Sequence, residues 1–191
     1  MALLVDQNSW KAHSRAMSLI PIPPEIPGIR GLLHAYPETA GPLMALAQVL
    51  LRGPSTLAEG ERELLAVAVS VENRCAFCSK SHAAAARVLL GPQASWVDAV
   101  LSGSPPLDLP ERLSALLVLA RSVARSGHET DAKAASQARA AGASDRELHD
   151  TVLIAAAFSL FNRYVDGLGA FEPEEAGYAA MGERLARFGY H

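Results

Sequence analysis

The feature that most constrains the fold is a run of eight residues, Leu64 to Val71, in which only Ser70 is polar. Before this run, Thr56-Leu-Ala-Glu59 has the spacing of a helix capping box, and after it Asn73 suits a left-handed C-terminal cap. A helix bounded by these residues is apolar on every side, and such a helix is stable only when other segments surround it. We therefore expect a helix ending near Glu72 at the centre of the protein.

The rest of the chain predicts further helices around this centre. Alanine, leucine, arginine and glutamate dominate the periodic stretches, and no Asn-Gly or Asp-Gly turn lies between alternating segments. Ser144 with Glu147, like Asp108 with Glu111, has capping-box spacing. The fold class is therefore expected to be all-α. The expected helices, besides the central one, are residues 37–52, 74 or 75 to 90, 93–101, 109–126, 131–141 and 145–167.

Length and composition favour a single domain, residues 1–191. A folded chain of 191 residues buries roughly 70% of its extended surface, so it needs neither a disulfide framework nor a structural metal. Residues 21–28 contain four prolines and are expected to form an extended arm that lies across a neighbouring surface. We expect an N-terminal segment over residues 1–28, a helical core over 29–170 and a C-terminal segment over 171–191.

Charge and hydropathy argue against two kinds of partner. The chain has 17 basic and 20 acidic residues and no basic block, so nucleic acid is not an expected partner. The first residues lack the order of a signal peptide, and every apolar stretch is interrupted before the ~18 residues that a bilayer span requires. We therefore expect no membrane partner and a cytoplasmic location.

The only two cysteines lie together as Cys75-Ala-Phe-Cys78. On a helix, residues three apart have Cβ atoms roughly 5–6 Å apart, which approaches the reach of a disulfide. Both cysteines would lie in the first turn, where the helix dipole lowers a thiol pKa, and Arg74 and Lys80 would add positive charge nearby. The pair is expected to alternate between thiols and a disulfide.

Two further residues are placed to act on this pair. His82 follows Cys78 by four residues, so it shares a helix face with that thiol and can accept its proton. Glu63 and His82 lie 10 and 9 residues from Asn73, roughly 15 and 13.5 Å along the two helices of an antiparallel hairpin, so they can meet. The carboxylate would then fix the tautomer of the imidazole and stabilise its protonated form. Cys75 is nearly two turns from His82, so the expected attacking thiolate is Cys78.

This arrangement resembles the alkylhydroperoxidase D-like (AhpD-like) group of the carboxymuconolactone decarboxylase superfamily. The signature of that group is Glu, eleven residues, Cys-x-x-Cys, three residues and His. The residues that match this spacing are Glu63, Cys75, Cys78 and His82. The Pro-rich arm and the late segment from Phe158 to Arg163 are similar to the branch called peroxidase-related enzymes, and the resemblance covers about residues 19–170.

The resemblance implies an all-helical homo-oligomer, a dimer, trimer or hexamer, that reduces hydroperoxides without metal, haem or flavin. In that scheme Cys78 attacks the peroxide, Cys75 resolves the product as a disulfide, and a thiol reductant or redox partner protein regenerates the thiols. His82 would be the base, and Glu63 would orient it. Studied members carry a second His directly before the second Cys, where this chain has Phe77. We therefore expect Cys75 to keep an ordinary thiol pKa.

Oligomerisation is also expected from the residues themselves. The stretch 59–90 is too apolar, and the arm 21–28 too extended, for the surface of a self-contained monomer. Asn162 and Arg163 interrupt the apolar run before them, so they are candidates for a buried polar contact, a pocket wall or a subunit contact.

Other functions remain open at this point. A thiol-disulfide carrier or redox sensor would use the same cysteine pair with little peroxide turnover. The cysteines could instead be small buried hydrophobic residues. A zinc site is weaker, because the two cysteines and His82 supply only three ligands where structural zinc prefers four. Lactone decarboxylation rests on the superfamily name alone.

Overall fold

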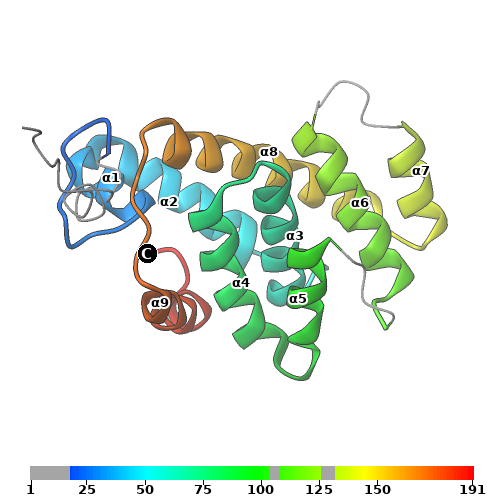
Figure 1. The fold of residues 1–191 in the computed structure, drawn as a ribbon. Helices are drawn as coiled ribbons and strands as arrows, with labels where there is room; N and C mark the ends of the chain where they lie inside the picture. Colours follow the sequence, from blue (N-terminus) through cyan, green and yellow to red (C-terminus); the bar gives the residue numbers. More distant parts are fainter. Residues whose placement is uncertain (1–17, 104–107, 126–131) are drawn as a thin grey trace, which may run out of the picture.

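The computed structural model describes residues 18–103, 108–125 and 132–191, and within these ranges it contains helices and no strand. The all-α prediction is confirmed. Figure 1 shows the elements in chain order. They are α1 (Ile29–Ala35), α2 (Pro37–Arg52), α3 (Glu59–Glu72), α4 (Ala76–Leu90), a 3₁₀ turn (Gly91–Gln93), α5 (Ser95–Ser102), α6 (Glu111–Arg125), α7 (Ala132–Ala140), α8 (Asp145–Gly167) and α9 (Glu175–Phe188).

Helix α3 lies at the centre, as its apolar surface predicts. Every side chain from Leu64 to Ser70 is fully buried, and α4, α5, α6 and α8 all pack against the helix. Figure 1 shows α4 and α5 next to α3, with α8 above them. The apolar surface of α3 is therefore covered within one chain. The argument that the stretch 59–90 needs a second copy to cover it was wrong for this helix.

Most helix bounds follow the predicted ones, and α3 begins later than expected. Helices α2 and α8 span the predicted residues. The predicted last residue of α6, 126, and the predicted first residue of α7, 131, lie outside the described residues. Ser144 caps α8 as predicted, accepting a hydrogen bond from the Glu147 backbone N–H at 3.2 Å. At α3 the capping carboxylate is Glu61, which accepts from the Ala58 backbone N–H at 2.9 Å, so Thr56 is not the cap.

The turn between α3 and α4 differs from the prediction by one residue. Asn73 has helical angles, and Arg74 is the residue with a positive φ, 60°. The Arg74 and Cys75 amides donate to the carbonyls of Val71 and Ser70, at 3.0 and 2.9 Å, which is the pattern of a Schellman motif. Asn73 stays helical while its side chain donates to Asn162 at 2.9 Å. The turn therefore delivers Cys75 directly to the start of α4.

Two helices were not predicted. Helix α1 has seven residues, and α9 contains two glycines, which lowers its helix signal. One of these glycines is required by packing, because a Cβ atom on Gly182 would lie 2.6 Å from the backbone carbon of Ala84. Helix α9 thus lies close against α4, as Figure 1 shows.

The Pro-rich arm packs on its own chain. The Leu19 amide donates to the Leu168 carbonyl at 2.8 Å, and the Gly28 amide donates to the Phe171 carbonyl at 2.9 Å. Gly28 has φ 62° and lies directly on the ring of Phe77. The surface that the arm crosses therefore includes the segment that follows α8 and the ring of Phe77.

Candidate active site

The two cysteines occupy the first turn of α4, and both are buried free thiols. Cys75 is the N-cap residue and is fully buried, and Cys78 is 3% exposed. The hydrogen bond with Cys78, together with burial, raises the pKa of the Cys75 thiol far above its ordinary value. The prediction of an ordinary or lowered pKa at Cys75 was therefore wrong, because these effects outweigh the helix dipole. Cys75 keeps its proton at neutral pH and can donate it toward Cys78.

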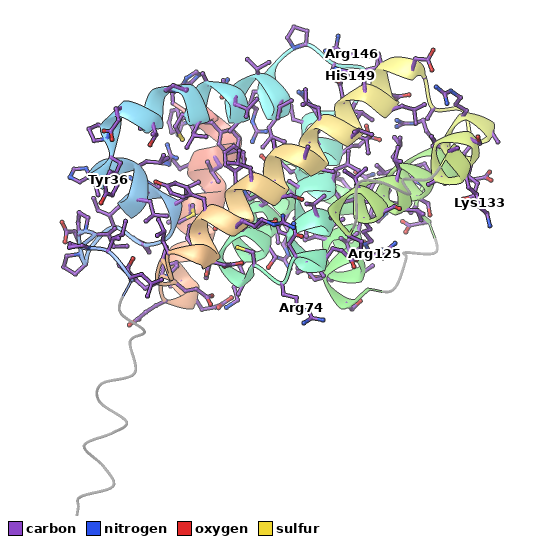
Figure 2. The ribbon with its side chains drawn as sticks, turned by 90° about the horizontal axis from the view of Figure 1, so that it is seen from above. Tyr36, Arg74, Arg125, Lys133, Arg146 and His149 are labelled. Carbon is purple, nitrogen blue, oxygen red and sulfur yellow. The ribbon has the colours of Figure 1, made fainter. Side chains whose placement is uncertain are left out.

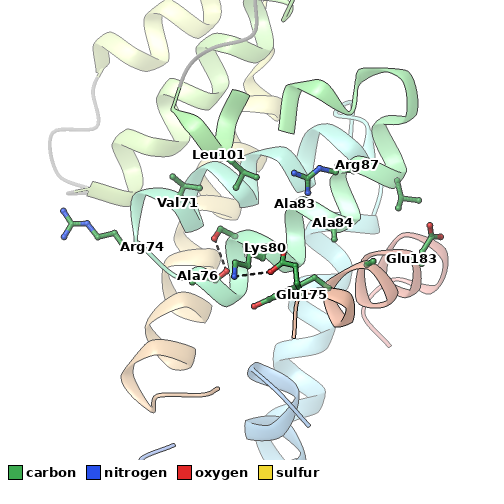
Figure 3. A pocket seen from close by; sticks show the side chains of 14 residues that line it. Val71, Arg74, Ala76, Lys80, Ala83, Ala84, Arg87, Leu101, Glu175 and Glu183 are labelled. Atoms are coloured by element: carbon green, nitrogen blue, oxygen red, sulfur yellow. Dashed lines mark hydrogen bonds and ion pairs between the residues drawn. The ribbon is translucent and has the colours of Figure 1, made fainter. Parts of the chain in front are cut away.

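The positive charges expected near the thiols are engaged elsewhere. Arg74 is exposed, and in Figures 2 and 3 its side chain points away from the bundle. Lys80 pairs with Glu172 at 3.0 Å and with Glu175 at 3.6 Å. Arg74 points away from the bundle and Lys80 is paired with acidic residues, so neither charge is directed at Cys78.

Glu63 and His82 meet across the α3–α4 hairpin. The His82 Nδ1 atom lies 2.7 Å from Glu63 Oε2, and the carboxylate is fully buried. Burial would raise the pKa of Glu63, but His82, Arg52 and Tyr190 together lower it below its ordinary value. The carboxylate is therefore ionised at neutral pH, and it can stabilise a protonated imidazole.

Two members of this cluster were not found from the sequence. Arg52, at the end of α2, donates from Nη2 to Glu63 Oε1 at 2.6 Å, and the Tyr190 hydroxyl donates to the same oxygen at 2.7 Å. Both residues lie outside the motif segment, and neither spacing nor helix periodicity relates residue 52 or 190 to residue 63. Only the packing of α2 and of the segment after α9 brings them together.

The hydrogen bonds around Glu63 assign the tautomer of His82. The hydroxyl of Tyr190 has one proton, and it is used on Glu63. Nδ1 of His82 faces a carboxylate oxygen at 2.7 Å and the Tyr190 oxygen at 3.1 Å, so it carries the hydrogen. Nε2 is then left with a free lone pair, which can accept a proton.

A small, mostly apolar cavity connects this base to the thiol. Its volume is about 50 Å³, and Cys78, His82 and Tyr190 contribute to its wall. The remaining lining residues are apolar and come from α1, α2, α4 and α8: Ile29, Leu33, Leu43, Met44, Ala47, Phe77, Phe158 and Phe161. Phe158 meets the His82 ring edge to face, with ring centroids 4.6 Å apart. One water occupies about 30 Å³ of liquid, so the cavity suits a molecule little larger than water.

A larger groove runs along the outer side of α4 and is separate from this cavity. Its volume is about 720 Å³, and Figure 3 shows Lys80 of α4 beside Glu175 of α9, with Arg87 further along α4. Neither cysteine belongs to its wall. The groove therefore offers no thiol chemistry.

Asn162 is a buried polar contact, one of the three roles expected for it. Its side chain accepts from Asn73 at 2.9 Å and donates to Ser70 at 3.1 Å, which ties α8 to the end of α3. Arg163 is exposed and donates to the Ser159 carbonyl of its own helix at 2.9 Å. Asn162 thus stabilises the turn that precedes the two cysteines.

Two other kinds of feature are absent from residues 18–103, 108–125 and 132–191. No group of three or more His, Cys, Asp and Glu side chains is arranged there to bind a metal ion. No helix in the same ranges is long and apolar enough to cross a membrane.

The fold and the site together define an all-helical protein whose central hairpin carries paired thiols beside a carboxylate–imidazole pair. Sequence comparison agrees with this class. The model of the carboxymuconolactone decarboxylase family matches residues 37–120, which include α2 to α5 and part of α6. No curated protein matches the sequence.

Solved structures resemble the whole helical core. An uncharacterized peroxidase-related protein with an alkylhydroperoxidase AhpD core, from Ralstonia eutropha JMP134, is 26% identical. Its TM-score is 0.73, with 87% of this chain and 94% of that chain covered. An uncharacterized peroxidase-related protein from Silicibacter sp. TM1040 is 27% identical, covers 80% of each chain and has a TM-score of 0.69. A protein of unknown function from Agrobacterium tumefaciens shares the fold at 24% identity, over 74% of this chain and 95% of that one, with a TM-score of 0.63. The chain is thus similar to carboxymuconolactone decarboxylase proteins over residues 37–120 and to AhpD-like proteins in the fold of its helical core.

Proposed function

We propose that this protein is a thiol-dependent peroxidase that reduces hydrogen peroxide or organic hydroperoxides. The observation that carries the proposal is the cavity that Cys78 and His82 share, with Glu63 on the other side of the imidazole at 2.7 Å. A base beside a buried thiol produces the thiolate that attacks peroxides. The names of the similar structures, which call two of those proteins peroxidase-related, support the same class.

The first half of the reaction uses Cys78 and His82. Nε2 of His82 takes the thiol proton, and the ionised Glu63 stabilises the resulting imidazolium. The thiolate attacks one peroxide oxygen, and the O–O bond breaks. Sulfur retains that oxygen as a sulfenic acid, and the leaving oxygen takes the proton from the imidazolium to give water or an alcohol.

The second half uses Cys75. Its sulfur, in contact with Cys78, attacks the sulfenic sulfur while its proton passes to the departing hydroxyl group, so that the S–O bond breaks, a disulfide forms and one water leaves. Two thiol groups of an external reductant then restore both cysteines. Their burial favours a small thiol as the reductant, and a redox partner protein would have to displace the residues that cover the sulfurs. We propose that this occurs in a cytoplasmic homo-oligomer, where reducing thiols are available.

Burial of the cysteines favours a peroxidase over a carrier that exchanges disulfides with a protein oxidant. A protein disulfide must reach the attacking sulfur, and Cys78 is only 3% exposed while Cys75 is fully buried. A hydroperoxide is small enough for its O–O group to enter the cavity beside Cys78. Lactone decarboxylation would leave the cysteine pair without a role.

Stopped-flow oxidation tests the proposal. The reduced protein is mixed with micromolar hydrogen peroxide, loss of free thiols is followed with a thiol reagent, and turnover is measured with a dithiol reductant present. We expect loss of two thiols per chain and repeated turnover, and we expect the Cys78→Ser variant to be unreactive. The Cys75→Ser variant is the matched control, because it should react once and then stop. Unchanged thiols in the wild type at micromolar peroxide would exclude the peroxidase and favour the carrier.

A further inference from the structure

Tyr190 completes the candidate site from outside the motif. Gly189, with φ 69°, turns the chain back after α9, and a Cβ atom there would lie 2.4 Å from Gln48 Oε1. That oxygen instead accepts a hydrogen bond from the Tyr190 amide at 2.8 Å. The side chain of Tyr190 is 6% exposed, so the segment after α9 inserts an aromatic ring into the bundle.

The ring of Tyr190 is held by contacts with His82 and Arg52. It stacks on His82 at an interplanar angle of 10° and a centroid distance of 6.0 Å, and the guanidinium of Arg52 lies 5.2 Å from its centroid. The same ring lines the cavity that contains Cys78. A rigid aromatic wall cannot move aside to admit a larger molecule without breaking these contacts.

The hydroxyl of Tyr190 acts on the base through Glu63. The groups that face this carboxylate are Arg52, His82 and Tyr190. Burial and the neighbouring Glu63 raise the pKa of Tyr190 well above its ordinary value, so the hydroxyl stays protonated and remains a donor at working pH. Its oxygen also faces His82 Nδ1 at 3.1 Å, and this contact favours the tautomer with a free Nε2.

We propose that Tyr190 is a positioning and specificity-determining residue of this site, whose ring limits the thiol cavity to small hydroperoxides while its hydroxyl orients the Glu63–His82 pair. The inference deepens the proposed peroxidase function and rests on it for the substrate. The size limit on access to Cys78 does not depend on peroxide chemistry, and it can be measured separately.

The peroxide experiment compares hydrogen peroxide with cumene hydroperoxide in four proteins. The wild type should react at least tenfold faster with hydrogen peroxide. Tyr190→Ala should reduce this ratio at least tenfold by admitting the bulky oxidant, and Tyr190→Phe should preserve the ratio because it keeps the ring. Phe188→Ala, which removes an aromatic residue that is 59% exposed at the end of α9, should match the wild type. A ratio unchanged in Tyr190→Ala would overturn the size limit.

The pH profile tests the hydroxyl. Tyr190→Phe removes one of the three groups that lower the pKa of Glu63, so the acid limb of the thiol oxidation rate should move to higher pH by about one unit. A merely structural Tyr190 would change stability and leave this limb in place. An unmoved acid limb in Tyr190→Phe would therefore overturn the orienting role.

Alkylation of Cys78 separates failure of this inference from failure of the peroxidase proposal. In the Cys75→Ser background, iodoacetamide and a fluorescein maleimide are compared without peroxide. Adding Tyr190→Ala should accelerate the maleimide at least tenfold more than it accelerates iodoacetamide. Tyr190→Leu serves the same purpose if the alanine variant does not fold. If wild-type thiols resist peroxide but the maleimide effect is present, the substrate assignment fails and the access role stands; equal acceleration of both reagents overturns the access role.

Discussion

Gly28 lies so close to Phe77 that a Cβ atom at residue 28 would come within 2.0 Å of Cζ of the ring. The backbone at Gly28 has φ 62° and ψ −148°, a region that only glycine adopts without strain. The Pro-rich arm therefore reaches the cysteine motif at a point where no side chain fits. Phe77, between the two cysteines, is the residue that the arm contacts.

Gly28→Ala should consequently destabilise the protein. We expect the free energy of unfolding to fall by about 2–3 kcal/mol, because the new methyl group adds both steric overlap and backbone strain. Chemical denaturation measures the change. Gly167→Ala is the control, since a Cβ atom there meets nothing within 4 Å at the end of α8, and it should stabilise by about 0.5 kcal/mol. Equal effects of the two substitutions would show that the contact with Phe77 has no energetic importance.

Removing the Glu63 charge should change both stability and its pH dependence. Glu63→Gln leaves Arg52 without its buried counter-ion, so we expect a loss of about 2–3 kcal/mol at pH 7. The pKa of Glu63 is lowered in the folded protein, so its contribution is complete above its ordinary value of 4.5 and is lost as the pH falls below that value. The difference between wild type and variant should therefore shrink between about pH 5 and pH 2.

Urea unfolding at several pH values checks this expectation, because other carboxylates titrate alike in both proteins and cancel in the difference. Glu174→Gln, at an exposed position, should show no such pH-dependent difference. A difference between Glu63→Gln and wild type that stays constant down to pH 2 would mean that the carboxylate is not ionised in the folded state.

The two cysteines should give different products with peroxide. Cys75→Ser should accumulate a sulfenic acid on Cys78 that a dimedone reagent traps, because the resolving thiol is absent. Cys78→Ser should leave Cys75 nearly unreactive, since burial raises its pKa even without the hydrogen bond of its partner. Intact mass spectrometry distinguishes the adducts. Fast oxidation of Cys78→Ser would reverse the assigned roles.

The strained turn residue offers a test of the hairpin geometry. Arg74 adopts a positive φ, which costs a residue with a β-carbon roughly 1–2 kcal/mol, and glycine avoids most of this cost. Arg74→Gly should raise the free energy of unfolding by about 0.5–1 kcal/mol after the greater freedom of the unfolded chain is subtracted. Arg74→Ala keeps the β-carbon and should change stability little, so an equal gain in both variants would locate the effect in the charge instead of the backbone.

The sequence predicted the parts of this protein that local chemistry determines. Ser144 and Glu147 mark the start of α8, and the apolar run after Leu64 marks the central helix, because capping and periodicity depend on neighbours in the chain. Glu63 and His82 could be paired because both belong to one hairpin. Their distances from the turn are set by the rise of a helix.

What could not be predicted depends on packing between distant segments. Tyr190 is 127 residues from its hydrogen-bond partner Glu63, and no periodicity relates them. Helix α9 was not predicted because Gly182 lowers the helix propensity of its segment. Glycine is needed at this position because a Cβ atom there would overlap Ala84. The raised pKa of Cys75 likewise results from its contact with Cys78 and its burial, which position in a helix does not reveal.

Because the Schellman turn at Arg74 fixes how α3 leads into α4, the number of residues between Glu63 and His82 determines whether their side chains meet. Each added residue rotates a helix by about 100° and advances it by about 1.5 Å, so a single insertion between Val71 and Cys75 would turn His82 away from the carboxylate while leaving every side chain of the site present. The reaction itself requires only that the groups meet. The number of residues in the motif is therefore set by helix geometry, and we expect insertions and deletions in related chains to lie outside this hairpin.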